Sequence, residues 1–119
     1  MDNKKDNRYY IGKIITDLAF IIEHTKNFTQ EELKDNEVLV DSIMFRLIQV
    51  AENSDKLTDE FKKLYSAIQW RAMKGMRNKI VHEYGNVDLT VIYDTVKNDI
   101  PKMLIQLRKI AEQIQPDIQ

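Results

Sequence analysis

The chain has 119 residues, with 18 Lys and Arg against 19 Asp and Glu, a formal net charge of -1, and 43% hydrophobic residues. This length allows one domain, residues 1–119, with one core, and the composition is typical of a globular protein. Zero Cys excludes disulfides, thiolate nucleophiles and Cys-ligated zinc, and two His are too few for a His-rich metal site within one chain.

The N-terminal segment, MDNKKDNRYY, lacks the apolar stretch of a secretory signal. No apolar run approaches the roughly 20 residues needed to span a bilayer. We therefore expect a cytoplasmic protein without membrane contact. Three Gly and two Pro in the whole chain favour long helices over a structure rich in tight turns.

Two long amphipathic helices are predicted in the first half of the chain, at about residues 9–26 and 37–56. In both, apolar residues recur at the i, i+3, i+4, i+7 spacing of a helix with one buried face. His24, near the end of the first helix, has no obvious carboxylate or second His as a partner, so we expect it to be a partly exposed, non-catalytic residue. Glu52 lies one position past the apolar face of the second, where we favour a solvated or cap-pairing carboxylate.

Shorter helices are predicted after Thr29 and Thr58, because each is an N-cap residue followed by acidic residues. Residues 70–82 form a further helix, which Gly85-Asn86 would end. The last helix begins after Asp88, and Pro101 predicts either a kink near residues 96–98 or a restart capped by Asp99. The sequence thus predicts an all-α, up-and-down four-helix bundle with one or two additional short helices.

The densest positive charge lies between residues 62 and 82, which contain six Lys or Arg and no Asp or Glu. Such a field attracts phosphate even in a nearly neutral chain, because salt screens the distant acids. Arg77, His82 and Tyr84 stand at its end. In an ideal helix residues 77 and 82 differ by about 140° around the axis, so the spacing alone does not identify an enzyme. Gly75 weakens this helix, which indicates a packing need or a close approach by a ligand or another backbone.

RNKIVHEY, read as R-N-x-x-x-H-x-Y, resembles the signature of the HEPN superfamily (higher eukaryotes and prokaryotes nucleotide-binding). More narrowly, the chain resembles HepT toxins, which are encoded beside a minimal nucleotidyltransferase antitoxin of the MntA type. The segments YYIGKIITDLAFI, LIQVAENSDKL and NDIPKML extend the likeness over about residues 8–114. The chain departs from the family at residues 49–53, QVAEN, where relatives commonly carry a Gly before a Glu-Ala pair.

This resemblance implies a HEPN-like bundle and a metal-independent endoribonuclease with no cofactor, in which Arg77 and His82 are catalytic and Asn78 supports them. A His suits proton transfer near neutral pH, and an Arg stabilises charge that builds up on phosphate oxygens. Attack by the ribose 2′-OH would restrict cleavage to RNA and leave 2′,3′-cyclic phosphate ends. The other basic residues of the helix are candidate RNA contacts: Arg71, Lys74 and Lys79.

The resemblance also implies a homodimer with two motif-bearing helix ends facing each other, and an antitoxin that places AMP on Tyr84. Trp70, Met73 and Met76 are candidates for the dimer interface or, equally, for the core of one protomer. For Tyr84 the alternative is a structural hydroxyl at the helix end. The alternative for the whole chain is a non-catalytic helical module that binds a nucleotidyltransferase or its substrate; a structural dimerisation bundle is a third possibility.

Overall fold

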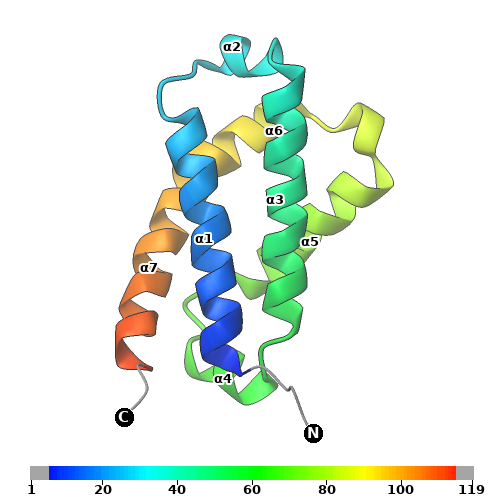
Figure 1. Ribbon diagram of the computed structural model, residues 1–119. Coiled ribbons are helices and arrows are strands. Elements are labelled where there is room, and N and C mark those ends of the chain that lie inside the picture. The colour runs from blue at the N-terminus through cyan, green and yellow to red at the C-terminus, as the bar shows by residue number, and fades with distance from the viewer. Residues whose placement is uncertain (1–5, 115–119) are drawn as a thin grey trace, which may run out of the picture.

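The structure, a computed structural model, describes residues 6–114, and the long helices of that range lie side by side as a bundle (Figure 1). The predicted all-α fold is confirmed, and the described residues contain no strand. The long elements are α1 (Asn7–Thr25), α3 (Glu37–Asp55), α5 (Trp70–His82) and a final composite helix made of α6 (Leu89–Asp94), a π-helical turn (Thr95–Asp99) and α7 (Ile100–Gln113).

The connections between the long helices carry short elements with the predicted caps. The Thr29 hydroxyl accepts a hydrogen bond from the Glu32 backbone N–H at 3.1 Å, and the Glu32 carboxylate accepts one from the Thr29 N–H at 2.9 Å, which makes a capping box. Thr58 and Asp88 also accept from backbone N–H groups at the helix starts that follow them. The short elements are α2 (Gln30–Lys34), α4 (Asp59–Leu64) and a 3₁₀ turn (Tyr84–Asn86).

Pro101 lies just after the π-helical turn, in the first turn of α7. The Ile100 N–H donates to the Thr95 carbonyl, five residues earlier, so the widened turn shifts the hydrogen-bond register where the proline lacks a donor. Where the sequence predicted a kink near residues 96–98, the structure has this π-helical turn. The alternative, a restart capped by Asp99, is wrong, because the Asp99 side chain makes no capping hydrogen bond.

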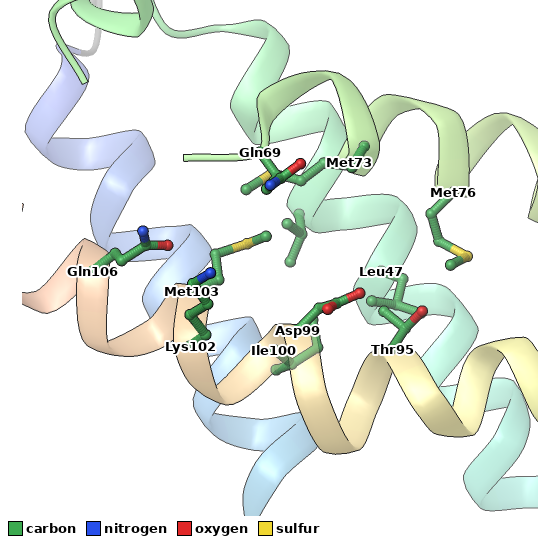
Figure 2. A pocket seen from close by; sticks show the side chains of 12 residues that line it. Leu47, Gln69, Met73, Met76, Thr95, Asp99, Ile100, Lys102, Met103 and Gln106 are labelled. Carbon is green, nitrogen blue, oxygen red and sulfur yellow. The ribbon is translucent and has the colours of Figure 1, made fainter. Parts of the chain in front are cut away.

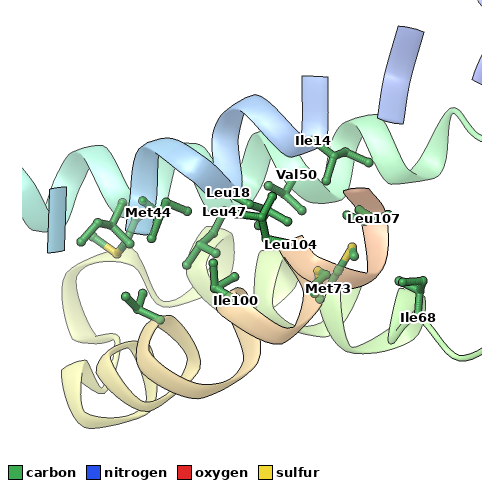
Figure 3. Packing of buried hydrophobic residues seen from close by; sticks show 14 of the residues in the cluster. Ile14, Leu18, Met44, Leu47, Val50, Ile68, Met73, Ile100, Leu104 and Leu107 are labelled. Atoms are coloured by element: carbon green, nitrogen blue, oxygen red, sulfur yellow. The ribbon is translucent and has the colours of Figure 1, made fainter. Parts of the chain in front are cut away.

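The core lies between α1, α3 and α7, whose apolar stripes face one another (Figure 3). In contrast, α5 packs chiefly on α3, and its outer end lies away from α1 and α7 (Figure 1). It contributes two fully or nearly buried side chains, Met73 and Ile80. The central buried residues include Ile14, Leu18, Ile43, Leu47, Val50, Ile92, Ile100, Leu104 and Leu107.

An ion pair joins α1 to α3 at the edge of this core. Arg46 Nη1 lies 2.7 Å from Asp17 Oδ1, and the Asp17 side chain is only 9% exposed. The Arg46 guanidinium also lies over the Phe20 ring, 3.8 Å from its centroid. A carboxylate taken out of water in this way needs its cationic partner.

Within residues 6–114, no helix combines the length and the apolar character needed to cross a membrane.

Candidate active site

Along its outward face, α5 carries two cations and a histidine in a single row: Arg71, Lys74 and His82. Residues at i, i+3, i+7 and i+11 of a helix lie on one face, so the row runs along the helix to its last residue, His82. Gly75 lies within the row, and a Cβ placed there would meet no atom within 4 Å. Packing inside the protomer therefore does not explain this glycine. The row consists of Arg71, Lys74, Asn78 and His82, with Lys79 exposed beside it.

Arg77 points from the flank of α5 toward α3, where it meets Glu52. Arg77 Nε and Nη2 lie 3.0 Å and 2.9 Å from the same oxygen, Glu52 Oε2. Its third nitrogen, Nη1, donates to Asn78 Oδ1 at 3.0 Å. All three nitrogens of the guanidinium are thus engaged, which fixes the plane of this cation at the junction of the two helices.

His82 is exposed at the C-terminal end of α5, and its ring makes no hydrogen bond to the described residues. Five residues separate it from Arg77, so the two side chains leave the helix about 140° apart. Asn78 lies between them: it accepts from Arg77 and stands one turn before His82 on the same face. Within one protomer the structure thus links Arg77 to Asn78 directly, and His82 to them only by position along the helix.

Tyr84 lies in the 3₁₀ turn that follows α5, and its side chain is 53% exposed. Its hydroxyl does not cap α5; it donates a hydrogen bond to Asp41 Oδ1 of α3 at 3.0 Å. This hydrogen bond, together with desolvation and the negative charges of Asp41 and Glu37, raises the pKa of Tyr84 above the ordinary value of 10.0. The phenol is therefore held in its neutral form, with its proton directed at a carboxylate.

α3 thus carries the acidic partners of both motif side chains. Asp41 and Glu52 are eleven residues apart, which places them about 16 Å apart along α3 and near the same face. Phe45 stands between them on that face with 57% exposure. Because Arg77 meets Glu52 and Tyr84 meets Asp41, the end of α5 and the turn after it run antiparallel along the outer side of α3.

Of the two expectations for Glu52, cap pairing is wrong: the side chain is 42% exposed to solvent and forms an ion pair with Arg77. Asp41 was not anticipated at all. Both partners come from an element distant in sequence, and helical periodicity does not show which flank of α3 faces α5. The one available signal was the absence of acids around Arg77, which requires any ionic partner to come from another helix.

Two concave regions lie in this part of the molecule, one beside α5 and one between α3 and the turn that follows α5. A cavity of about 250 Å³ separates α5 from α7 and is lined mainly by apolar side chains; Met73 lies at the same end of it as Met103, and Met76 lies at the other end (Figure 2). Neither Arg77 nor His82 lines it. The second, of about 350 Å³, includes Tyr84 in its wall.

The three residues considered for an interface differ in their surroundings. Met73 is 7% exposed and belongs to the core. The Trp70 indole N–H donates to the backbone carbonyls of Lys62 and Tyr65 at 3.2 Å and 3.1 Å, so this side chain holds the connection before α5 in place. Met76 is half-buried at the cavity.

Comparison with known proteins gives a consistent result across nearly the whole chain. Residues 14–110 match the family model described as "Ribonuclease HepT-like". A Methanocaldococcus jannaschii protein, named as a gamma-glutamylcyclotransferase and candidate RNase, is 31% identical over 93% of this chain and 50% of its own length. The chain thus corresponds to about half of that relative.

Two further relatives are matched over nearly their full length. A candidate RNase from Caldanaerobacter subterraneus subsp. tengcongensis is 30% identical over 91% of this chain and 96% of its own. A probable ribonuclease HepT from Thermococcus cleftensis is 30% identical over 92% of this chain and 99% of its own. No solved structure matches.

Proposed function

The chain belongs to the HepT-like ribonuclease family, and from this we propose that it is an endoribonuclease that acts as the toxin of a toxin–antitoxin pair. RNA is the substrate class, as the ribonuclease names of the relatives also indicate. The observation that carries the proposal is the arrangement of Arg77, Asn78 and His82. A guanidinium with all its nitrogens engaged and an exposed imidazole stand at the end of a helix whose outer face is basic.

In the proposed reaction the ribose 2′-OH attacks the adjacent phosphorus, and the 5′ oxygen of the next nucleotide leaves. His82 moves a proton from the attacking hydroxyl or onto the leaving oxygen, a role typically worth about 10²–10⁴ in rate. Arg77 stabilises the charge on the non-bridging oxygens. Asn78 holds Arg77 through its Oδ1, and the exposed cations of α5 bind the flanking phosphates: Arg71, Lys74 and Lys79.

We propose a homodimer as the active form. Arg77 and His82 leave α5 in different directions within one protomer, and a two-fold pair would offer two of each around one cleft. Three exposed apolar side chains near the site are suited to such an interface: Val38 at 78%, Phe45 at 57% and Val81 at 46% exposure. Phe45→Asp should convert a dimer into monomers in light scattering and abolish RNA cleavage while the monomer remains folded.

Tyr84 is the proposed acceptor for AMP from a cognate nucleotidyltransferase antitoxin of the MntA type. Tyr84 is an exposed residue, and it lies two residues beyond His82. An adenylyl group there would place negative charge and bulk beside the path of the RNA phosphate, and would thus silence the enzyme. Mass spectrometry after incubation with the antitoxin and ATP tests this step.

The central experiment compares wild type, His82→Ala and His24→Ala, each expressed alone. His24 is a matched control, because it also is exposed near a helix end, where Nδ1 contacts the Phe20 carbonyl and the ring stacks on Phe20. We expect wild type and His24→Ala to stop growth and degrade RNA, and His82→Ala to do neither. If all three behave alike, the chain is the non-catalytic module that binds a nucleotidyltransferase or its substrate.

Product analysis tests the mechanism separately. We expect 2′,3′-cyclic phosphate and 5′-OH ends without added metal, and no cleavage of DNA of the same sequence, because DNA lacks the attacking hydroxyl. Products with only 5′-phosphate ends and a requirement for Mg²⁺ would contradict the role given to His82.

A further inference from the structure

Tyr84 Oη must lose its proton if Tyr84 is to be adenylylated, and this hydroxyl donates a hydrogen bond to the carboxylate of Asp41. We propose that Asp41 is the proton acceptor for adenylyl transfer to Tyr84. This inference rests on the proposed function, since it concerns the regulation of the same site, and it assigns to this chain a catalytic part in its own modification.

The transfer balances as follows. Tyr84 Oη attacks the α-phosphorus of ATP, the bond between the α-phosphorus and the bridging oxygen to the β-phosphorus breaks, and pyrophosphate leaves. The proton of the phenol moves along the existing 3.0 Å hydrogen bond to Asp41 Oδ1 and from there to solvent. A neutral phenol is a weak nucleophile, so the step requires a base within hydrogen-bond reach of its proton.

Asp41 is suited to this role by its surroundings. None of the Lys or Arg side chains among residues 6–114 forms an ion pair with Asp41, so no cation occupies its carboxylate oxygens. The neighbouring cation on α3, Arg46, is held by Asp17. Asp41 is exposed, and the proton can therefore pass on to water.

The shape of the surface leaves room for the nucleotide. Tyr84 and Asp41 share the wall of the concave region of about 350 Å³, which is open to solvent and is also lined by Lys34, a cation that can contact phosphate. The pKa of Tyr84, raised mainly by the hydrogen bond to Asp41, agrees with this geometry. The phenol does not ionise by itself near neutral pH, so its proton must leave during the transfer.

The test measures the rate at which a cognate nucleotidyltransferase and ATP add AMP to the peptide that contains Tyr84. Asp41→Asn keeps the shape and a hydrogen-bond acceptor but cannot take the proton, and we expect it to slow labelling by about 10²-fold or more. Glu37→Gln is the matched control, because Glu37 lies in the same wall and acts on Tyr84 only through its charge. It should remain within about twofold of wild type, and Asp41→Glu should recover part of the rate.

Three readouts separate the possible outcomes. Asp41→Asn labelled at the wild-type rate would overturn the role of Asp41 while leaving adenylylation of Tyr84 intact. Wild type that gains no AMP under any condition would remove the proposed regulation together with this inference. RNA cleavage by Asp41→Asn at the wild-type rate, with an unchanged circular dichroism spectrum, would show that any slowed labelling is not a folding defect.

Discussion

Glu52 provides the sharpest test of how the fold positions the proposed catalytic cation. We consider Glu52→Ala, Arg77→Ala and the double variant as a thermodynamic cycle, with Glu60→Ala as the control. Glu60 is an exposed acid on α4 without an ion pair to the described residues. The cycle isolates the free energy of interaction between the two side chains from the effect that each substitution has by itself.

The expected stability effect follows from the geometry. Two charge-assisted N–H groups, at 3.0 Å and 2.9 Å, meet one carboxylate oxygen, but the side chains are 35% and 42% exposed. Water screens a pair of this kind, so we expect a coupling free energy of only about 0.5–1 kcal/mol. Loss of the pair should lower Tm by about 2–5 °C in thermal unfolding, whereas Glu60→Ala should leave it nearly unchanged.

The expected effect on catalysis is larger. Arg77→Ala should lower kcat by about 10²–10³-fold, because it removes the charge that stabilises the transition state. Glu52→Ala retains the charge but loses its placement, and should lower kcat by about 10–100-fold without weakening RNA binding, since the site becomes more positive. In the Arg77→Ala background, Glu52→Ala should not lower kcat any further. A Glu52→Ala variant with wild-type or higher kcat, or losses that multiply in the double variant, would refute this reasoning.

Three further predictions follow from other parts of the structure. Gly75→Ala and Gly12→Ala should each stabilise the protein by about 0.5–1 kcal/mol in urea unfolding, since both glycines lie in helices with open space at the Cβ position, but only Gly75→Ala should weaken RNA cleavage. Equal activity of the two variants would mean that nothing approaches α5 at Gly75. Arg46→Ala should lower the free energy of unfolding by about 3–5 kcal/mol in urea unfolding, because it leaves Asp17 buried without its cation; a decrease below about 1 kcal/mol would contradict this. Because the pKa of Tyr84 is raised in the folded state, its contribution to the free energy of unfolding is fully present below pH 10.0 and is lost as the pH rises through the folded-state pKa. A ¹³C NMR titration of the tyrosine ring measures this pKa.

The helices themselves could be predicted from the sequence because their determinants are local. The bounds of α5 at Trp70 and His82 follow from the apolar spacing and the turn residues after it, and the caps at Thr29 and Thr58 depend on residues three positions apart. The disturbance before Pro101 was predictable for the same reason, although its form, a π-helical turn, was not.

The partners of the motif residues could not be predicted in this way. Arg77 meets Glu52 across 25 positions of sequence, and Tyr84 meets Asp41 across 43. Periodicity assigns each of these side chains to the edge of its own helix, but the angle and register between α3 and α5 decide which edges meet. This angle and this register depend on how Met73 and Ile80 pack in the core, which is a property of the whole bundle.

The one-sided attachment of α5 has an energetic consequence. A helix whose backbone neighbours belong chiefly to α3 can detach locally at a fraction of the free energy required to unfold the entire domain. Its amide protons should consequently exchange with solvent through such openings sooner than those at the centres of α1 and α3. The segment that bears Arg77 and His82 can thereby adjust its pose to a bound strand while the remaining helices keep their packing.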